Sequence, residues 1–537
     1  MPRSVGPEVR AATRLRPVDA AWAFALRAGL AVAIPLVTLV AADRPSWAGV
    51  ATFGAFTALY ARDEPYRRRA RVLTAAAAGL VACVVIGTLV EGSGPGSVVA
   101  VALVGGVATL VCGRFRVGPP GGLMFAFATA VTSALPAGAG GSGAGGAATL
   151  ATWSSAGGNV WRNAALCAGS AALAWLIAMA GALVDRDAPM RLAVARALRA
   201  AATLAAAPGG PAGLQARYQA ALAVEKAWRA VPASRPAEAL LVAHAETELS
   251  GPHGHDPAVA AQLRTLADAA AKRGPAPALT TDRGEADEVR GRRMATLLLR
   301  DPLRRAPGPL LPAAARVAAG ALAAGAVAGM LAHLTGLGHP YWAALSAVAV
   351  LQADSLRLTL QKAMQRAAGT ILGLFLAGAA VALPGGKWTL VASIAIAQVV
   401  AELLVVRNYG LAMLAITPLA LLVGELGRPT PPMELIGDRL VQTLLGCALG
   451  LAAAALVRNR AAARHLEDAI NQVAAATSVL RREPAGATGE ARRLALLLLR
   501  LREAYVVASG EPGLAPDATE RVLKAERAAR QALVARH

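Results

Sequence analysis

Residues 317–353 read VAAGALAAGAVAGMLAHLTGLGHPYWAALSAVAVLQA and contain no Asp, Glu, Lys or Arg. A helix that crosses a bilayer needs roughly 20 mostly apolar residues, so this stretch is typical of a chain buried in lipid. Residues 117–161, 163–184 and 440–457 are equally free of charged side chains. The sequence therefore predicts a polytopic membrane protein, with the lipid bilayer as its first partner.

The composition of the whole chain agrees. Of its 537 residues, 56% are hydrophobic and 16% are charged, whereas soluble domains carry about 25% charged residues. This excludes a typical soluble enzyme and a disordered protein. Most of the charge lies in residues 185–305 and 458–537, so the net charge of +21 is not concentrated on one folded domain. We therefore expect no nucleic-acid partner.

Apolar runs bounded by charged residues, Pro and Gly predict two blocks of six spans. The predicted spans are 22–42, 46–60, 72–90, 97–113, 119–136 and 160–184, then 313–335, 340–356, 366–383, 388–406, 409–426 and 438–457. The expected domains are an N-terminus (1–20), a first six-span repeat (21–185), a helical domain (186–310), a second six-span repeat (311–457) and a C-terminal helical domain (458–537).

Basic residues predict the orientation. Arginines and lysines follow the second, fourth, eighth and tenth spans, whereas residues 91–97 and 136–159 contain none. By the positive-inside rule, both termini and both polar domains are cytoplasmic, and the protein lies in the inner membrane. The apolar run 28–42 has no Ala-x-Ala cleavage site after it, so we interpret it as part of the first span.

The two blocks carry matching residues in the same order. Trp47 precedes Arg71 by the same interval that separates Trp342 from Arg366, and Arg162 corresponds to Arg439. Blocks with an even number of spans have the same orientation, and their relating axis runs along the membrane normal. The predicted fold is an all-α polytopic membrane protein with two parallel six-helix repeats, each followed by a cytoplasmic helical region.

Charged residues at or within spans are candidate functional residues, because they are costly in lipid. Arg71 and Arg366 are predicted to begin the third span of each block, and Arg162 and Arg439 the sixth. A guanidinium group suits recognition of a substrate carboxylate. The alternative is that these arginines only snorkel to the membrane surface or set the topology.

Four other residues complete the predicted site. Trp47 and Trp342 are candidates for stacking on an aromatic substrate, with interfacial anchoring as the alternative. Glu402, with Gln398 one turn earlier, is the candidate proton-coupling residue. Its alternative role is a structural ion pair with Arg407 or Arg366. Asp354 is the second proton-coupling candidate, with a capped surface charge as the alternative.

Motifs for other chemistry are missing from the sequence. Gly385-Gly386-Lys387 lacks the earlier glycine of a Walker A loop, and there is no Gly-x-Ser-x-Gly motif. The cysteines (Cys83, Cys112, Cys167 and Cys447) lie in apolar runs without metal-ligand spacing. We therefore expect no cofactor, no metal and no enzymatic activity.

One region resembles a known family. The stretch from Pro340-Tyr341-Trp342-Ala343 through Arg366 to Gly373 resembles the fusaric acid resistance (FUSC) family, which is related to aromatic acid exporters and aluminium-activated malate transporters. The first block is a more degenerate copy, with Thr74 at the position of Gly369. The resemblance implies an inner-membrane, proton-driven exporter of small organic or aromatic acids.

Combined with the repeat, this resemblance predicts a proton-coupled exporter of small organic anions, with a path between the two blocks. Two alternatives remain open from the sequence: an organic-anion channel, and a membrane scaffold that recruits a partner through its cytoplasmic helices. A homo-oligomer is compatible with all three.

Overall fold

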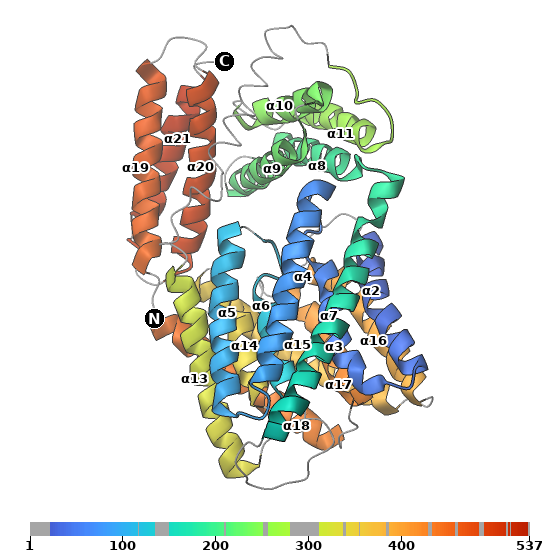
Figure 1. Cartoon of the computed structure of the whole chain (residues 1–537). Helices are drawn as coiled ribbons and strands as arrows, with labels where there is room; N and C mark the ends of the chain where they lie inside the picture. Colours follow the sequence, from blue (N-terminus) through green and yellow to red (C-terminus); the bar gives the residue numbers. More distant parts are fainter. Residues whose placement is uncertain are drawn as a thin grey trace. The chain divides into compact units, whose positions relative to one another are not determined.

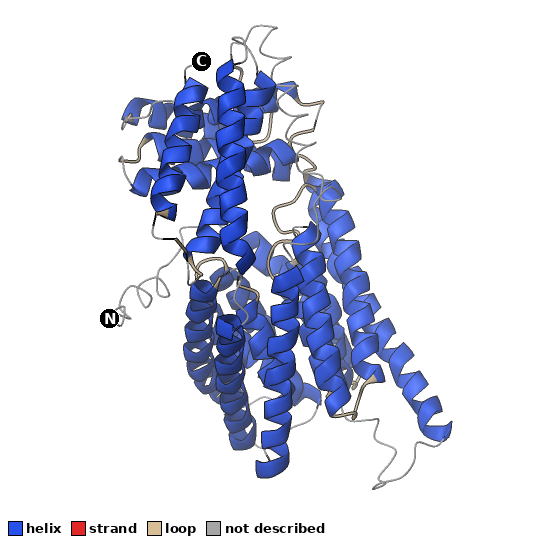
Figure 2. Cartoon of the chain, turned by 90° about the vertical axis from the view of Figure 1, so that its left-hand side faces the viewer, coloured by secondary structure: helices blue, strands red, loops and turns tan. Residues whose placement is uncertain are grey.

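The computed structural model describes most of the chain. The described residues are 22–115, 117–134, 150–208, 211–232, 234–250, 256–279, 311–336, 340–353, 355–382, 386–427, 432–456, 460–482, 488–511, 514–515 and 517–534. All regular structure within these ranges is helical, and Figure 2 shows no strand. The predicted all-α class is therefore confirmed for the described part of the chain.

The chain divides into two compact units. We call residues 1–62, 67–181 and 306–458 the membrane unit, and residues 63–66, 182–305 and 459–537 the polar unit. The chain leaves the membrane unit near residue 181, returns near residue 306 and leaves it again near residue 458. Each unit is described by itself below.

The membrane unit contains the apolar helices (Figure 1). Its first block is formed by α2 (Trp22–Ala41), η1 (Pro45–Trp47), α3 (Ala48–Ala55), η2 (Phe56–Leu59), α4 (Tyr66–Leu89), α5 (Pro95–Phe115), α6 (Leu123–Ser133) and α7 (Leu150–Val184). Its second block is formed by α13 (Leu311–Thr335), α14 (Tyr341–Leu351), α15 (Leu356–Ala382), α16 (Gly386–Val405), α17 (Tyr409–Gly427) and α18 (Pro432–Leu456).

The structure does not confirm twelve spans. Among the described residues, eight helices are long and apolar enough to cross a membrane: α2, α4, α5, α7, α13, α15, α16 and α18. The predicted span 46–60 is instead broken into η1, α3 and η2, while α6 and α14 have 11 residues each. The described apolar part of α17 is limited to Tyr409–Val423. An uncharged run in the sequence gives an upper limit to the length of a membrane span, and the helix within it can be shorter.

The short helices lie in the interior, which explains why they can be short. All residues of α14 except Tyr341 are buried, and so are all residues of α3 except Gly49. Neighbouring helices enclose these two elements, so they do not have to cover the thickness of the hydrocarbon layer themselves. Backbone that departs from a continuous helix is tolerated at this depth where protein surrounds it.

The two blocks contact each other in a reciprocal manner. Helix α2 packs against α16, and α5 packs against α13, so the first span of each block lies beside the fourth predicted span of the other (Figure 1). The short helices follow the same rule, because α3 contacts α17 and α14 contacts α6.

Glycines allow the close helix packing that their small-xxx-small spacing predicts. A Cβ atom at Gly369 would lie 2.5 Å from both the Gly410 carbonyl oxygen and Met413 Cβ. A Cβ at Gly373 would lie 2.7 Å from Thr417 Cβ. Gly446 and Gly450 approach α14 in the same way, and Gly325 approaches Val98. At Gly329, no atom of the described residues lies within 4 Å of the position that a Cβ atom would take, so no close helix contact is seen there.

The polar unit consists of two helical bundles. The first contains α8 (Ala188–Ala205), α9 (Pro211–Ala230), α10 (Pro236–Ser250) and α11 (Pro257–Ala271), packed around the buried Trp228. The second contains α19 (Arg460–Arg482), α20 (Thr488–Ser509) and α21 (Ala518–Val534). Leu494 and Leu501 of α20 are buried in the second core. Contacts of α20 with α9, and of α21 with α10, join the two bundles.

Candidate functional site

The most unusual side chain of the membrane unit is Arg439, on α18. It is only 2% exposed, and its Cζ atom lies 3.4 Å from the centre of the Trp342 ring on α14. Neither Nε nor Nη1 of Arg439 has a hydrogen-bond partner among the described residues. Leaving two nitrogens of a buried guanidinium without an acceptor costs several kcal/mol, so this position favours an anion.

A second buried arginine acts on the first. Arg366 on α15 is 4% exposed, and its charge repels that of Arg439. Its Nε donates to Ser346 Oγ at 3.2 Å, and its Nη1 donates to the Tyr409 hydroxyl at 3.0 Å. These partners are neutral, and neither arginine forms an ion pair with a carboxylate of the described residues. We call Trp342, Ser346, Arg366, Tyr409 and Arg439 the arginine cluster.

The helix boundaries explain why Arg366 is buried. It was predicted to begin a span, but α15 begins at Leu356, so Arg366 lies ten residues inside the helix. The close contact of Gly369 with α17 then brings Arg366 near Tyr409. Ser346 and Tyr409 were not predicted as site residues, because a neutral hydroxyl within an apolar run carries no distinctive signal.

The corresponding residues of the first block are also paired, but in a more exposed place. Arg162 Cζ lies 5.7 Å from the centre of the Trp47 ring, and Arg44 Cζ lies 5.0 Å from the same ring. Arg162 is exposed, and its electrostatic interactions include the carboxylate of Glu91. The pairing of an arginine with a tryptophan, which the sequence did not predict, thus recurs in both blocks, although the Arg439 pair is the more deeply buried.

Arg71 lies apart from these pairs, on an exposed face of α4, where its Nε donates to the Arg67 carbonyl at 3.5 Å. The buried arginine of this helix is Arg69, which donates to the carbonyls of Ala61, Arg62 and Ala178. Sequence reasoning missed Arg69, because neighbouring arginines differ only in the helix face on which they lie.

Arg316 was also missed. It is 2% exposed on α13, and its Nη2 donates to the Ala353 carbonyl at 3.0 Å. Its position inside the predicted span 313–335 was the available signal, because charge within a span is costly.

Glu402 lies three residues before the end of α16, at Val405. Its Oε1 accepts a hydrogen bond from Gln398 Nε2 at 3.1 Å, and the cation that acts on it is Arg62 of the first block. The two partners considered in its alternative role are engaged elsewhere: Arg407 donates to the Leu403 carbonyl at 2.9 Å, and Arg366 belongs to the arginine cluster. Asp354 lies outside the described residues.

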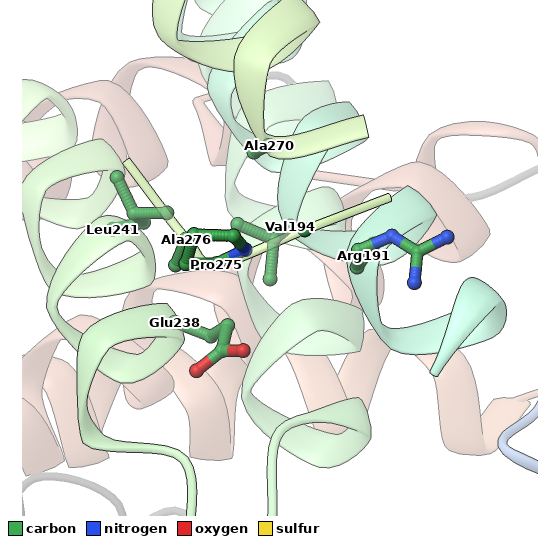
Figure 3. Close-up of a pocket in the computed structure, with 8 residues that line it drawn as sticks. Arg191, Val194, Glu238, Leu241, Ala270, Pro275 and Ala276 are labelled. Carbon is green, nitrogen blue, oxygen red and sulfur yellow. The ribbon is translucent and has the colours of Figure 1, made fainter. Parts of the chain in front are cut away.

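A small pocket in the polar unit offers no comparable chemistry (Figure 3). Arg191 and Glu238 contribute its charged side chains, and Val194, Leu241 and Ala276 are among its apolar ones. The Arg191 guanidinium is already bound to Asp185 through two hydrogen bonds of 2.6 and 3.1 Å. The pocket is therefore not a candidate substrate site.

Comparison with known proteins addresses the second block directly. Residues 326–453 match the fusaric acid resistance protein-like family. The matched region contains the whole arginine cluster and Glu402, and it confirms the resemblance seen in the sequence. This match, together with eight apolar helices among the described residues, indicates a multi-pass membrane protein.

A second comparison extends the likeness beyond this region. The chain is 25% identical to the "Uncharacterized membrane protein YvaC" of Bacillus subtilis (strain 168), over 94% of this chain and 84% of that protein. The likeness therefore includes both blocks and both polar regions. No solved structure matches the chain.

Proposed function

We propose that the protein transports small organic anions across the inner membrane, and that the arginine cluster binds the anion. The observation that carries this proposal is Arg439: it is buried, stacked on Trp342 and without a hydrogen-bond acceptor for Nε or Nη1 among the described residues. Arg366 adds a second positive charge nearby. A carboxylate bound there would provide the missing acceptor and neutralise part of this charge.

The position of the cluster supports transport. Trp342 lies on a short buried helix, and its ring centre is 5.7 Å from that of Phe127 on α6 of the first block. Short or interrupted helices at corresponding positions of two repeats commonly mark the substrate site of a transporter. Helices α3 and α14 fit this description, and the reciprocal contacts between blocks support two parallel repeats. Substrate would then pass between the blocks.

Export driven by protons is the finer part of the proposal. Glu402 is the proposed proton carrier. It lies on α16 of the second block, and α16 packs against α2 of the first block. Gln398 and Arg62 interact with its carboxylate, so a change in its protonation would alter contacts between the two blocks. Asp354 remains the second candidate. The proposed orientation keeps both termini and the polar unit in the cytoplasm.

An anion channel is the competing function. It is favoured by one feature of the cluster: no carboxylate of the described residues pairs with Arg366 or Arg439, so the cluster itself carries no titratable partner for coupling. In a channel, the two arginines would attract anions and no alternation would be needed.

The test is transport by the full chain in proteoliposomes, with a panel of aromatic and dicarboxylic acids. Arg439→Gln removes the charge, and we expect about a tenfold or greater loss of transport, as for a charge-assisted hydrogen bond worth 1.5–3 kcal/mol. The matched control is Arg67→Gln, because Arg67 is an exposed arginine of the same unit. Unchanged transport by a correctly inserted Arg439→Gln protein would remove the cluster from the substrate path.

A further inference from the structure

A second group of arginines lies in the polar unit, where the two helical bundles meet. Arg217 belongs to α9 of the first bundle, whereas Arg502 and Arg530 belong to α20 and α21 of the second. All three surround a single buried carboxylate, that of Glu526, which is 6% exposed. We call these four residues the bundle-junction cluster.

The Glu526 carboxylate forms its closest ion pair with Arg530. Arg530 Nη2 lies 2.6 Å from Glu526 Oε2, whereas the closest approach of Arg502 to Glu526 is 3.9 Å. Arg217 Nη1 donates to the Leu249 carbonyl, a neutral acceptor, and interacts with Arg530 and Glu526 only through their charges. The four residues of the bundle-junction cluster carry three positive charges and one negative charge, which is a surplus of two positive charges within the cluster.

The surplus sets this cluster apart from two other ion pairs of the polar unit, those of Arg191 with Asp185 and of Arg521 with Glu467. Hydrogen bonds that Arg191 and Arg521 donate to Asp185 and Glu467 raise the pKa values of these two arginines. At the bundle junction, the pKa values of the arginines are lowered instead of raised. Burial and the neighbouring arginines lower the pKa of Arg530, and they lower the pKa of Arg217 to about 10. The cationic forms are therefore insufficiently compensated here.

We propose that the bundle-junction cluster binds a phosphate group and that the bound phosphate joins the two bundles. A phosphate monoester carries roughly −1.5 to −2 charges at pH 7, which matches the surplus. Guanidinium groups donate to phosphate oxygens in parallel pairs, and the planar donors of Arg217 and Arg502 come from different bundles. Such a ligand would stabilise the contact of α9 with α20.

The experiment measures thermal unfolding of the purified full chain in neutral detergent, with inorganic phosphate replacing chloride at constant ionic strength. Binding to the folded state raises the melting temperature by mass action. Phosphate also stabilises proteins generally through exclusion from their surfaces, and that effect is common to all variants. The informative quantity is therefore the gain from phosphate in each variant.

Two variants at the cluster should change that gain in opposite directions. In Arg502→Gln, we expect phosphate to bind about tenfold or more weakly, since a charged hydrogen-bond donor is lost. In Glu526→Gln, the surplus becomes larger, so phosphate should bind more tightly even if the melting temperature without phosphate falls. Arg502→Lys keeps the charge without the planar fork and should retain part of the gain.

The matched control is Arg493→Gln. Arg493 lies on the same helix, is 54% exposed and pairs with Glu490 at 3.5 Å. It should show the wild-type gain. Equal gains in the wild type, Arg502→Gln, Glu526→Gln and Arg493→Gln would overturn the proposal.

A second arm distinguishes the source of the phosphate group. Phosphatidic acid added to the detergent micelles is compared with the same micelles containing phosphatidylcholine. A gain with inorganic phosphate indicates a soluble ligand, and a gain confined to phosphatidic acid indicates a lipid headgroup. In either case the gain must be lost in Arg502→Gln. No gain from either probe would contradict phosphate binding.

Discussion

Arg71 and Arg366 stand at equivalent places in the two sequence blocks, but their surroundings differ completely. Arg71 is exposed on α4, whereas Arg366 is 4% exposed and donates to Ser346 and Tyr409. The difference arises because α4 and α15 present different faces to their neighbours. Residue type and spacing identified both arginines as candidates, but only packing distinguishes a buried guanidinium from one that faces outward.

The role of Glu402 can be tested by Glu402→Gln. We expect this variant to lose accumulation driven by a pH gradient while retaining exchange of substrate, because glutamine keeps the hydrogen-bonding shape but cannot carry a proton. The measurement is uptake into proteoliposomes with and without the gradient. A channel has no coupled step, so for a channel the driven and the passive flux would change together.

A carboxylate at the other end of the same helix pair provides the control. Asp43 follows α2 and binds Lys387 of α16 at 2.9 Å. This hydrogen bond and the lysine charge hold the pKa of Asp43 below its ordinary value, so it stays ionised near neutral pH. Asp43→Asn should therefore retain driven accumulation. Wild-type accumulation by a stable Glu402→Gln protein would eliminate the coupling role and transfer it to Asp354.

At the scale of helices, Asp185 shows how one carboxylate links helix ends. Asp185 follows α7 and receives hydrogen bonds from Arg191, at the start of α8, and from Arg273, after α11. It thereby links the start of α8 to the segment after α11, within the first polar bundle, through one carboxylate that is 15% exposed. The hydrogen bond from Arg191, with a further one from Arg273, lowers the pKa of Asp185 to about 2.

This shift predicts a pH dependence of stability. Because the folded-state pKa lies below the unfolded value of about 3.9, the stabilisation is present above pH 4 and is lost as the pH falls toward 2. Asp185→Asn should lower the free energy of unfolding at pH 7 by on the order of 2 kcal/mol, since one pKa unit is worth about 1.4 kcal/mol. The difference from the wild type should disappear between pH 4 and pH 2.

Thermal melting of the full chain in detergent, followed over this pH range, provides the measurement. The control is Asp268→Asn, because Asp268 is 67% exposed and pairs with Arg199 at 3.0 Å. Exposed pairs contribute little, so a much smaller change is expected. An Asp185→Asn protein that melts like the wild type at pH 7 would contradict this assignment.

At the scale of the whole molecule, the proposed orientation follows from loop charge, and a labelling experiment tests it. Ser93 lies in the exposed α4–α5 connection, and Ser478 is exposed on α19 of the polar unit. An impermeant thiol reagent should label Ser93→Cys in intact cells and Ser478→Cys only after permeabilisation. The four native cysteines are buried, which keeps the background low. Labelling of Ser478→Cys in sealed cells would reverse the orientation.

Sequence alone determined the character of the chain. Uncharged runs such as residues 317–353 showed that the chain lies in a lipid bilayer, because charged side chains are costly in lipid whatever the fold. Three- and four-residue periodicity determined the helical bundles of the polar unit. The type and spacing of Trp342, Arg366 and Arg439 identified candidates for the site, because charge within an apolar run is rare enough to be noticed.

Tertiary structure decided what those candidates touch. Helix α14 is short and surrounded by other helices, so Trp342 contacts Arg439 and both side chains are buried. Packing also buries Arg69 and leaves Arg71 exposed. It brings arginines from two bundles near Glu526. It places Arg62 of the first block near Glu402 of the second. These outcomes depend on which helix faces meet, and contacts between residues far apart in the chain leave no periodicity or local spacing by which a single sequence would reveal them.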